Sequence, residues 1–390
     1  MRREASQFDM TINVRDGAAK AGSDWFWTKV WLNLIKAVEH LLADMDIALN
    51  TMDGPRLVVP WEEIDAHMKS ASKTVKLARA KTMNNEFRRW PAPRTGFLAG
   101  NVTSKAWEDN VCHRPDLQGL EGILVHPLSA SSTKTCFPMF GGPKLALNNE
   151  ILLPAPMYWN KEERFGGGND HGIQRHEKAN KVIWHGVATG GKNFPDNWRG
   201  SHRHRFVSMN DGTKIGRTVL GRQGRELSEY GVQAEKDARL GPMVDEFADQ
   251  YHNKFVPDID GNSLSGRYLG FLRSASLPIK TTIFRKWRDS RLLHWKHFVP
   301  TDSRFLDYYG IMEYFLGYEG CHAHDKAAER IAMEGKEWAE KVLRKEDMSI
   351  YVLRLLLEYA RVVDDDRESM GWVQDVIRNP SLEKSWKRWW

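Results

Sequence analysis

The sequence contains few cysteines, no long apolar run and no internal repeat. Its three cysteines, Cys112, Cys136 and Cys321, have neither the number nor the spacing of a disulfide framework or a zinc knuckle, although a bond between Cys112 and Cys136 stays open. No apolar run approaches the ~20 residues that cross a bilayer. The opening MRREASQFDM is too polar for a signal peptide. We therefore expect a soluble chain without a solenoid architecture.

The composition is that of a folded globular protein. Hydrophobic residues make up 41% and charged residues 28% of the sequence. The length of 390 residues is enough for two ordinary domains. Lys and Arg exceed Asp and Glu by 57 to 51, a net charge of +6. This modest excess is compatible with an anionic ligand or with nucleic acid, so charge alone does not choose between them.

Strands are expected to alternate with helices along the chain. Residues 28–43 carry apolar side chains at helical spacing and predict an amphipathic helix. The apolar run 47–49 predicts a buried strand that ends in a turn at Asp53. Further strands are expected at 122–127, 136–142, 150–159, 181–184, 253–261, 276–284 and 294–302, with helices over 303–363.

This alternation implies an α/β protein with parallel sheets. The polar, glycine-rich residues 160–178 predict a domain boundary. We expect Rossmann-like domains at 1–178 and 179–350, and a helical segment at 351–390 that packs back across them. In open α/β sheets ligands bind beyond the carboxyl ends of strands, so the loops after Leu49, Trp184 and Asp258 should line a cleft between the domains.

Two of these loops have the residue types of anion sites. The segment KVIWHGVATGGKNFPDNWRGSHRHRF, 181–206, combines glycines with five Lys or Arg residues. Glycine lets backbone N–H groups approach phosphate, and the guanidinium matches phosphate oxygens. In 258–276, Ser263 and Ser265 are expected to cap a helix that carries Arg267 in its first turn. Two such segments together favour a bound diphosphate over solvated surface loops.

Asp53 has the position of a general base. A carboxylate at the end of a strand, opposite an anion site, can remove a proton from a hydroxyl nucleophile. From the residues alone, an aspartate that stabilises the turn before Gly54-Pro55 is the favoured interpretation.

The motifs WHGVATGGKN, WRGSHRHRF, DGNSLSGR, SLPIK, HWKHFVP and HDKAAERIAMEGKEWAEKVL, in this order, resemble glycosyltransferase family 90. This family includes capsule-associated xylosyltransferases and protein O-glucosyltransferases. The resemblance covers residues 35 to 365 and implies a GT-B architecture, two Rossmann-like domains facing across a cleft with C-terminal helices. It also implies an inverting, metal-independent transfer of xylose or glucose from a UDP-α-sugar to a hydroxyl of a glycan or protein.

The resemblance implies roles for individual residues. The pattern DMDIALNTMDGP gives the catalytic base to Asp53. The resemblance also implies a site for the UDP-sugar. The arginines that bind its diphosphate are Arg267 and either Arg203 or Arg205, which the alignment does not separate. The other expected members of this site are Ser263, Ser265, Gly186, Thr189, Gly190 and Lys280.

The sequence also departs from the family pattern. His185 stands where the family usually has arginine, and the cysteine framework and ER-retention tail of the protein O-glucosyltransferases are missing. These differences favour the capsule-associated branch. The resemblance implies a Golgi or ER lumen, where the sequon at Asn101 would matter. Membrane attachment is expected only if an N-terminal anchor precedes this sequence.

Three alternatives remain open. A metalloenzyme could use His202 and His204 or the Cys321-His-Ala-His324 segment, but the first pair is surrounded by arginines that repel a cation. A protein that binds sugar or nucleotide without catalysis would keep the same fold. Nucleic-acid binding is not favoured, because the basic residues cluster at two loops rather than along a stripe with stacking aromatics. We expect no metal and no cofactor besides the UDP-sugar substrate.

Overall fold

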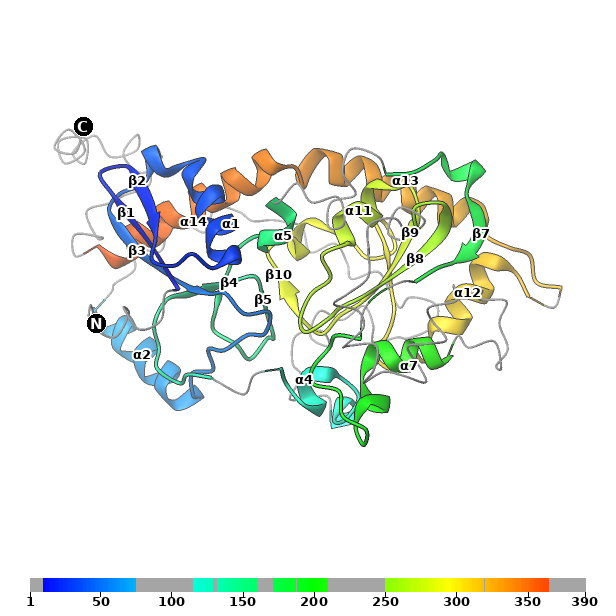
Figure 1. Ribbon diagram of the computed structural model, residues 1–390, viewed down its shortest axis with the longest axis horizontal. Helices are drawn as coiled ribbons and strands as arrows, with labels where there is room; N and C mark the ends of the chain where they lie inside the picture. The colour runs from blue at the N-terminus through cyan, green and yellow to red at the C-terminus, as the bar shows by residue number, and fades with distance from the viewer. Residues whose placement is uncertain are drawn as a thin grey trace. The chain divides into compact units, whose positions relative to one another are not determined.

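The structure is a computed structural model that describes residues 10–74, 115–128, 132–159, 171–184, 186, 188–209, 250–318 and 320–364 (Figure 1). Cys112, His185 and the sequon at Asn101 lie outside these ranges, and Cys136 and Cys321 are exposed free thiols. Contacts divide the chain into two compact units, residues 1–48 with 345–390, and residues 49–344. The domain limits expected near residues 178 and 350 stay a prediction.

The first unit contains a β-hairpin and two helices. Strands β1 (Thr11–Arg15) and β2 (Ala18–Ala21) pair antiparallel around a turn in which Asp16 and Gly17 both have positive φ. This left-handed geometry matches the twist of the two strands. Strand β3 (Met45–Asn50) pairs antiparallel with β1 and confirms the strand predicted there. Helix α1 (Phe26–Lys36) contacts α14 (Lys345–Val363).

The predicted helix at 28–43 is shorter than expected. Helix α1 ends at Lys36, and a separate 3-10 turn follows at Glu39–Leu41. Between them Val38 has a non-helical φ of −133°. Hydrophobic spacing continues through the break because Val38 and Leu42 are both buried, so periodicity alone could not locate the helix end.

The second unit contains a four-stranded parallel sheet. Its order is β11 (Val299–Pro300), β9 (Leu277–Thr281), β8 (Asn253–Ile259) and β7 (Ala179–Val182). All three neighbouring pairs are parallel, so the carboxyl ends of the strands share one edge. Strands β8, β9 and β11 fall within predicted strand segments, and β7 overlaps the segment predicted at 181–184 but begins two residues earlier. The mixed α/β class with parallel pairing is therefore confirmed, whereas the GT-B arrangement stays a prediction.

Helices cover both faces of this sheet. Phe255 and Ile259 of β8 belong to a core shared with α7 (His202–Met209), α12 (Tyr308–Leu316) and α13 (Asp325–Val342). Val256, which points to the opposite face, packs against Phe271 of α11 (Tyr268–Arg273). A strand buried on both faces is expected to be apolar throughout. Asp258 on β8 and Lys280 on β9 break that pattern at the carboxyl ends.

The rest of the second unit consists of short elements. Strands β4 and β6 pair in parallel, and β5 pairs antiparallel with β10. Their bounds and those of the remaining helices are β4 (Met139–Gly141), β5 (Pro143–Lys144), β6 (Ile151–Leu152), β10 (Arg285–Lys286), α2 (Trp61–Thr74), α4 (Gly122–Val125) and α5 (Pro156–Trp159). Short 3-10 turns lie at Pro115–Leu117, Arg175–Glu177, Trp198–Gly200 and Asp289–Arg291. Within the described ranges no helix is long and apolar enough to span a bilayer.

The strand predicted at 122–127 is wrong, because this segment forms helix α4. A β-carbon at Gly122 would collide with the carbonyl oxygen of Gly190, and a β-carbon at Gly191, where φ is +93°, would lie 2.4 Å from the oxygen of Gly122 and 2.5 Å from that of His126. The backbone N–H of Lys192 donates to the oxygen of His126 at 2.8 Å. Helix α4 and the 188–192 loop therefore contact each other through backbone, which requires glycine at these positions.

We expect Gly122→Ala to destabilise the protein by at least ~2 kcal/mol, because the added methyl group collides with backbone that cannot move aside cheaply. Urea unfolding monitored by circular dichroism measures the change. Gly54→Ala is the matched control, since a β-carbon there meets no atom within 4 Å. Equal midpoints for the two variants would contradict the close-contact argument.

Candidate active site

Arg203 connects the loops that follow β7 and β8. It lies in the first turn of α7 and is buried. Its Nε donates to the carbonyl oxygen of Asp260 at 2.9 Å, and its Nη2 donates to that of Ile259 at 3.0 Å. Its Nη1 donates to the hydroxyl of Thr189 at 2.6 Å. The guanidinium is thus held at the carboxyl edge of the sheet, where ligands bind in open α/β folds.

Arg205 has a different environment. Residues two apart on a helix do not share a face, and Arg205 donates through Nη2 to the carbonyl oxygens of Leu120 at 2.6 Å and Ser303 at 3.0 Å. It secures neighbouring loops. Arg203, in contrast, shares the indole ring of Trp184 with Arg267, their guanidinium carbons lying 5.6 and 5.5 Å from its centroid. The structure therefore brings Arg203, rather than Arg205, together with Arg267.

The segment that leads into α11 carries buried hydroxyls. Arg267 is the N-cap residue of α11, and no side chain caps this helix, so the prediction that Ser263 and Ser265 cap it is wrong. The hydroxyls of both serines and the indole N–H of Trp184 are buried, and none of them has a hydrogen-bond partner among the described residues. An unpaired buried polar group costs ~1–3 kcal/mol. These three groups are suited to a polar ligand that enters beside the two arginines.

Lys280 takes part in a buried ion network. It lies directly opposite Asp258 across the β8–β9 pair. Its Nζ lies 2.7 Å from a carboxylate oxygen of Asp258 and 2.7 Å from one of Asp260. Asp260 also accepts from Lys286 at 2.9 Å and from the hydroxyl of Thr282. The expected contact of Lys280 with the nucleotide stays a prediction, and its amine is held by two carboxylates.

Positive charge exceeds negative charge in this buried region. Arg288 packs between the rings of Tyr158 and Tyr268, and Lys280 lies over the second of these rings. Among the described residues, five buried cations lie in this region with two buried carboxylates, and the exposed Asp289 also acts on Lys286 and Arg288. The cations are Arg203, Arg267, Lys280, Lys286 and Arg288, and the carboxylates are Asp258 and Asp260. An excess of buried cations is unfavourable unless an anion compensates it.

The pKa values reflect this crowding. Burial lowers the pKa of Arg203 to about 9, and the nearby charge of Arg267 adds to the effect. Burial also lowers the pKa of Lys286 to about 8, although Asp260 opposes the change. For Asp260, burial acts to raise the pKa, but Lys280 and Lys286 outweigh it and hold the pKa well below its usual range. The two lysines thus keep the carboxylate ionised.

The glycines of the 186–191 loop allow the backbone to pack closely against neighbouring rings. At Gly190, with φ +124°, a β-carbon would lie 2.6 Å from the ring of His202, and at Gly186 it would lie 2.7 Å from the ring of Trp184. Thr189 accepts the hydrogen bond from Arg203. The predicted donor residues Gly186, Thr189 and Gly190 therefore lie next to Arg203 and Trp184, and their contact with phosphate stays a prediction.

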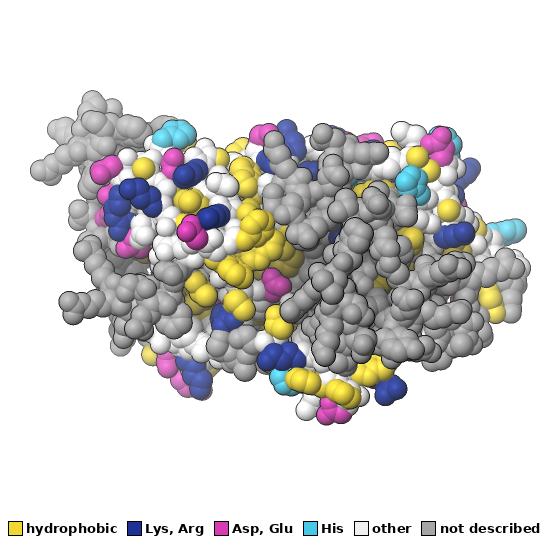
Figure 2. Space-filling view, viewed as in Figure 1, with side chains coloured by type: hydrophobic (Ala, Val, Ile, Leu, Met, Phe, Trp, Pro, Cys, Tyr) yellow, Lys and Arg dark blue, Asp and Glu magenta, His cyan; other side chains and the backbone are white. Residues whose placement is uncertain are grey.

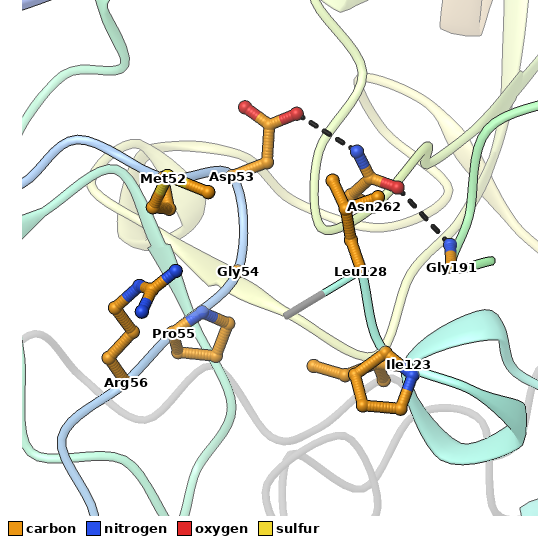
Figure 3. A pocket seen from close by; sticks show the side chains of 10 residues that line it. Met52, Asp53, Gly54, Pro55, Arg56, Ile123, Leu128, Gly191 and Asn262 are labelled. Carbon is orange, nitrogen blue, oxygen red and sulfur yellow. Dashed lines mark hydrogen bonds between the residues drawn. The ribbon is translucent and has the colours of Figure 1, made fainter. Parts of the chain in front are cut away.

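Asp53 lies at the rim of a pocket, on the loop after β3 (Figure 3). The side-chain Nδ2 of Asn262 donates to its Oδ2 at 3.0 Å. The Oδ1 of Asn262 accepts from the backbone N–H groups of Gly190 at 3.2 Å and Gly191 at 3.1 Å. Asn262 thus joins Asp53 to the loop that carries Thr189. Sequence reasoning did not select this residue, because an asparagine in a DGN turn is commonly a turn residue.

The pocket combines polar and apolar groups. Asp53 and Arg56 are the ionisable side chains among its lining residues, and Met52, Ile123 and Leu128 add apolar surface. The backbone N–H groups of Arg56 and Leu57 both donate to the buried carboxylate of Glu150, which fixes the loop that follows Asp53. Asn262 and Glu150 thus hold the loop on either side of Asp53, and the carboxylate can face a polar substrate in the pocket.

The histidines of the metal alternative have other contacts. His202 bonds through Nε2 to the carbonyl oxygen of Asp260 at 2.7 Å, and His204 packs edge-on against Trp198. His324 stacks on Tyr314 with ring centroids 4.1 Å apart. In the part of the chain that the structure describes, no three His, Cys, Asp or Glu side chains converge on a position that could hold a metal ion.

The sequence profile of glycosyl transferase family 90 matches residues 136–378 of the chain. This match covers more than half of the sequence. The protein belongs to glycosyl transferase family 90. The matched region includes Arg203, Asn262 and Arg267, whereas Asp53 precedes it. The family makes the protein a glycosyltransferase, with a sugar donor and a glycan or protein acceptor.

We expect the free energy of unfolding to rise by about 2 kcal/mol between pH 8 and pH 10 because of Lys286. Its pKa is about 8 in the folded protein, below the usual 10.5, so over this range the unfolded chain binds more protons and stability increases with pH. Urea unfolding across the range measures this. Lys286→Met should reduce the rise by about 2 kcal/mol and leave the part that comes from the lowered pKa of Arg203, while Lys296→Met, at an exposed lysine, should leave the whole rise intact. Parallel curves for all three proteins would contradict the assignment.

Proposed function

We propose that this protein transfers xylose or glucose from a UDP-α-sugar to a hydroxyl group of a glycan or protein, with inversion at the anomeric carbon. The observation that carries the proposal is the excess of buried cations beside unpaired buried hydroxyls at the carboxyl ends of β7 and β8. A nucleoside diphosphate supplies negative charge and hydrogen-bond acceptors together. Such a ligand compensates both features at once.

In the proposed reaction Asp53 acts as general base. The acceptor oxygen attacks the anomeric carbon from the face opposite UDP and its proton passes to the Asp53 carboxylate. The bond between the anomeric carbon and the β-phosphate oxygen breaks, and UDP leaves with the electron pair. The new glycosidic bond has the β configuration. Inversion needs a single displacement, so one carboxylate at the acceptor side is sufficient.

The leaving group is stabilised by donors that are already in place. Three hydrogen bonds fix the guanidinium of Arg203, and Arg267 lies over the same indole ring. Preorganised donors aimed at developing charge cost no reorganisation during the reaction. The proposed reaction is therefore independent of a divalent cation. If dialysis against a chelator abolished transfer and zinc restored it, this part of the proposal would be wrong.

A non-catalytic binding protein and a nucleic-acid-binding protein would each predict a different site or surface. A binding protein of the same fold would not need a carboxylate at the pocket rim, where Asp53 lies. A nucleic-acid-binding protein would need a continuous basic surface. On the coloured part of the face in Figure 2, Lys and Arg side chains alternate with Asp and Glu. We place the protein in the capsule-associated branch and in the secretory pathway on the resemblance alone.

Asp53→Asn should lower the rate of transfer by about 10²–10⁴-fold, because the amide cannot accept the proton. UDP release from a panel of UDP-sugars, with and without acceptor, measures the rate and identifies the donor. UDP affinity, measured by calorimetry, should stay within about threefold of the parent, since the substitution keeps size and shape. Equal loss of UDP affinity would make Asp53 a structural residue.

Arg203→Met should weaken UDP binding by about 10–100-fold, the effect of losing charge-assisted hydrogen bonds to phosphate. Arg205→Met is the matched control, because the same side chain two residues further along α7 bonds to Leu120 and Ser303 instead. It should lower stability and leave UDP affinity of the folded protein unchanged. The reverse ranking of the two variants would mean that Arg205 contacts the diphosphate.

A further inference from the structure

We propose that Asn262 is a positioning residue that orients the carboxylate of Asp53 toward the acceptor. The inference rests on the proposed role of Asp53 as base. Asn262 lies in the loop between β8 and α11, 209 residues from Asp53 in the sequence. Figure 3 shows its amide between the two loops, with one hydrogen bond to Asp53 and one to Gly191 drawn.

The orientation of the Asn262 amide is determined by its partners. Its oxygen accepts from two backbone N–H groups, those of Gly190 at 3.2 Å and Gly191 at 3.1 Å. Backbone N–H groups can only donate, so the oxygen must face them and the NH2 group must face Asp53. The NH2 group then holds Oδ2 of Asp53 at 3.0 Å. This assignment leaves Oδ1, which makes no hydrogen bond to a described residue, to take up the acceptor proton.

The loop that holds the amide is closely packed. Gly190 packs against the ring of His202, and Gly191 packs against the backbone of Gly122 and His126. His202 in turn bonds to the carbonyl oxygen of Asp260, two residues before Asn262. The amide of Asn262 therefore contacts the closely packed backbone of Gly190 and Gly191 on one side and the half-buried carboxylate of Asp53 on the other. A carboxylate on a loop gains a defined direction from such a contact.

The alternative is that Asn262 only fastens the glycine loop. Two variants separate the contact from the role. In Asn262→Asp the aspartate keeps an oxygen for the N–H groups of Gly190 and Gly191, but it replaces the donating NH2 group with a second oxygen facing Asp53. Two carboxylates this close hold one proton between them and titrate at separate pH values, one of them higher than usual, so this variant tests whether the contact with Asp53 exists. Asn262→Leu removes the contact, and its kcat compared with its UDP affinity tests whether the contact orients the base.

The experiment is a pH profile of transfer at saturating UDP-sugar for the parent, Asn262→Asp and Asn197→Asp. We expect Asn262→Asp to move half-maximal activity on the acid side upward by about one pH unit or more. Arg56, the other ionisable group lining the pocket, is the same in all three proteins. Asn197→Asp is the matched control, because Asn197 also joins two backbone groups of this loop, Phe194 N at 2.8 Å and Lys192 O at 3.2 Å, without contacting Asp53. It should keep the parental profile.

A profile for Asn262→Asp that coincides with that of the parent would overturn the inference. Asn262→Leu provides the second test, and it also applies if Asn262→Asp does not fold. It should lower kcat at least ~10-fold while UDP affinity stays within about threefold, whereas an equal loss of UDP affinity would also overturn the inference. Failure of the proposed function is separate and visible, because Asp53→Asn would then retain transfer.

Discussion

Two carbonyl oxygens at the end of β8 hold the site together. Ile259 and Asp260 direct their backbone oxygens beyond the sheet edge, and the oxygens accept from Arg203 and His202 of α7. A parallel strand leaves such groups unpaired where its ladder ends, and they need a donor if they are buried. Here α7 supplies the donors. The same contacts place one guanidinium of the proposed donor site and fix the ring against which Gly190 packs.

Charge determines the rest of the site. Burying one cation is costly, and burying several near one another is more so. The carboxylates of Asp258 and Asp260 compensate Lys280 and Lys286, and the rings of Tyr158 and Tyr268 face Arg288. The guanidinium groups of Arg203 and Arg267 both lie against the ring of Trp184. Asp258 also acts on both arginines and Asp260 acts on Arg203, yet burial still lowers the pKa of both guanidinium groups. An anionic substrate would relieve that cost of burial.

The sequence allowed most of the sheet of the second unit to be predicted, because β8 and β9 are largely apolar and are followed by polar turns, whereas β7 has only one buried residue and begins before the apolar run that predicted it. It did not allow α4 to be recognised. Gly122-Ile-Leu-Val is apolar and β-branched like a strand, and the contact of Gly122 with Gly190 joins residues far apart in the chain. Arg203 and Arg205 could not be separated from motifs alone, since the direction of each side chain depends on where α7 begins. Asn262 was missed because its partners come from two distant loops.

The contact between Asp53 and Asn262 also bears on how the protein is made. The two residues are 209 positions apart, and a ribosome adds ~5–20 residues each second. The aspartate therefore leaves the ribosome roughly 10–40 seconds before the amide that holds it. During that interval the nascent chain lacks both the amide and the later arginine Arg267, so the proposed catalytic group is assembled only when most of the polypeptide has been synthesised.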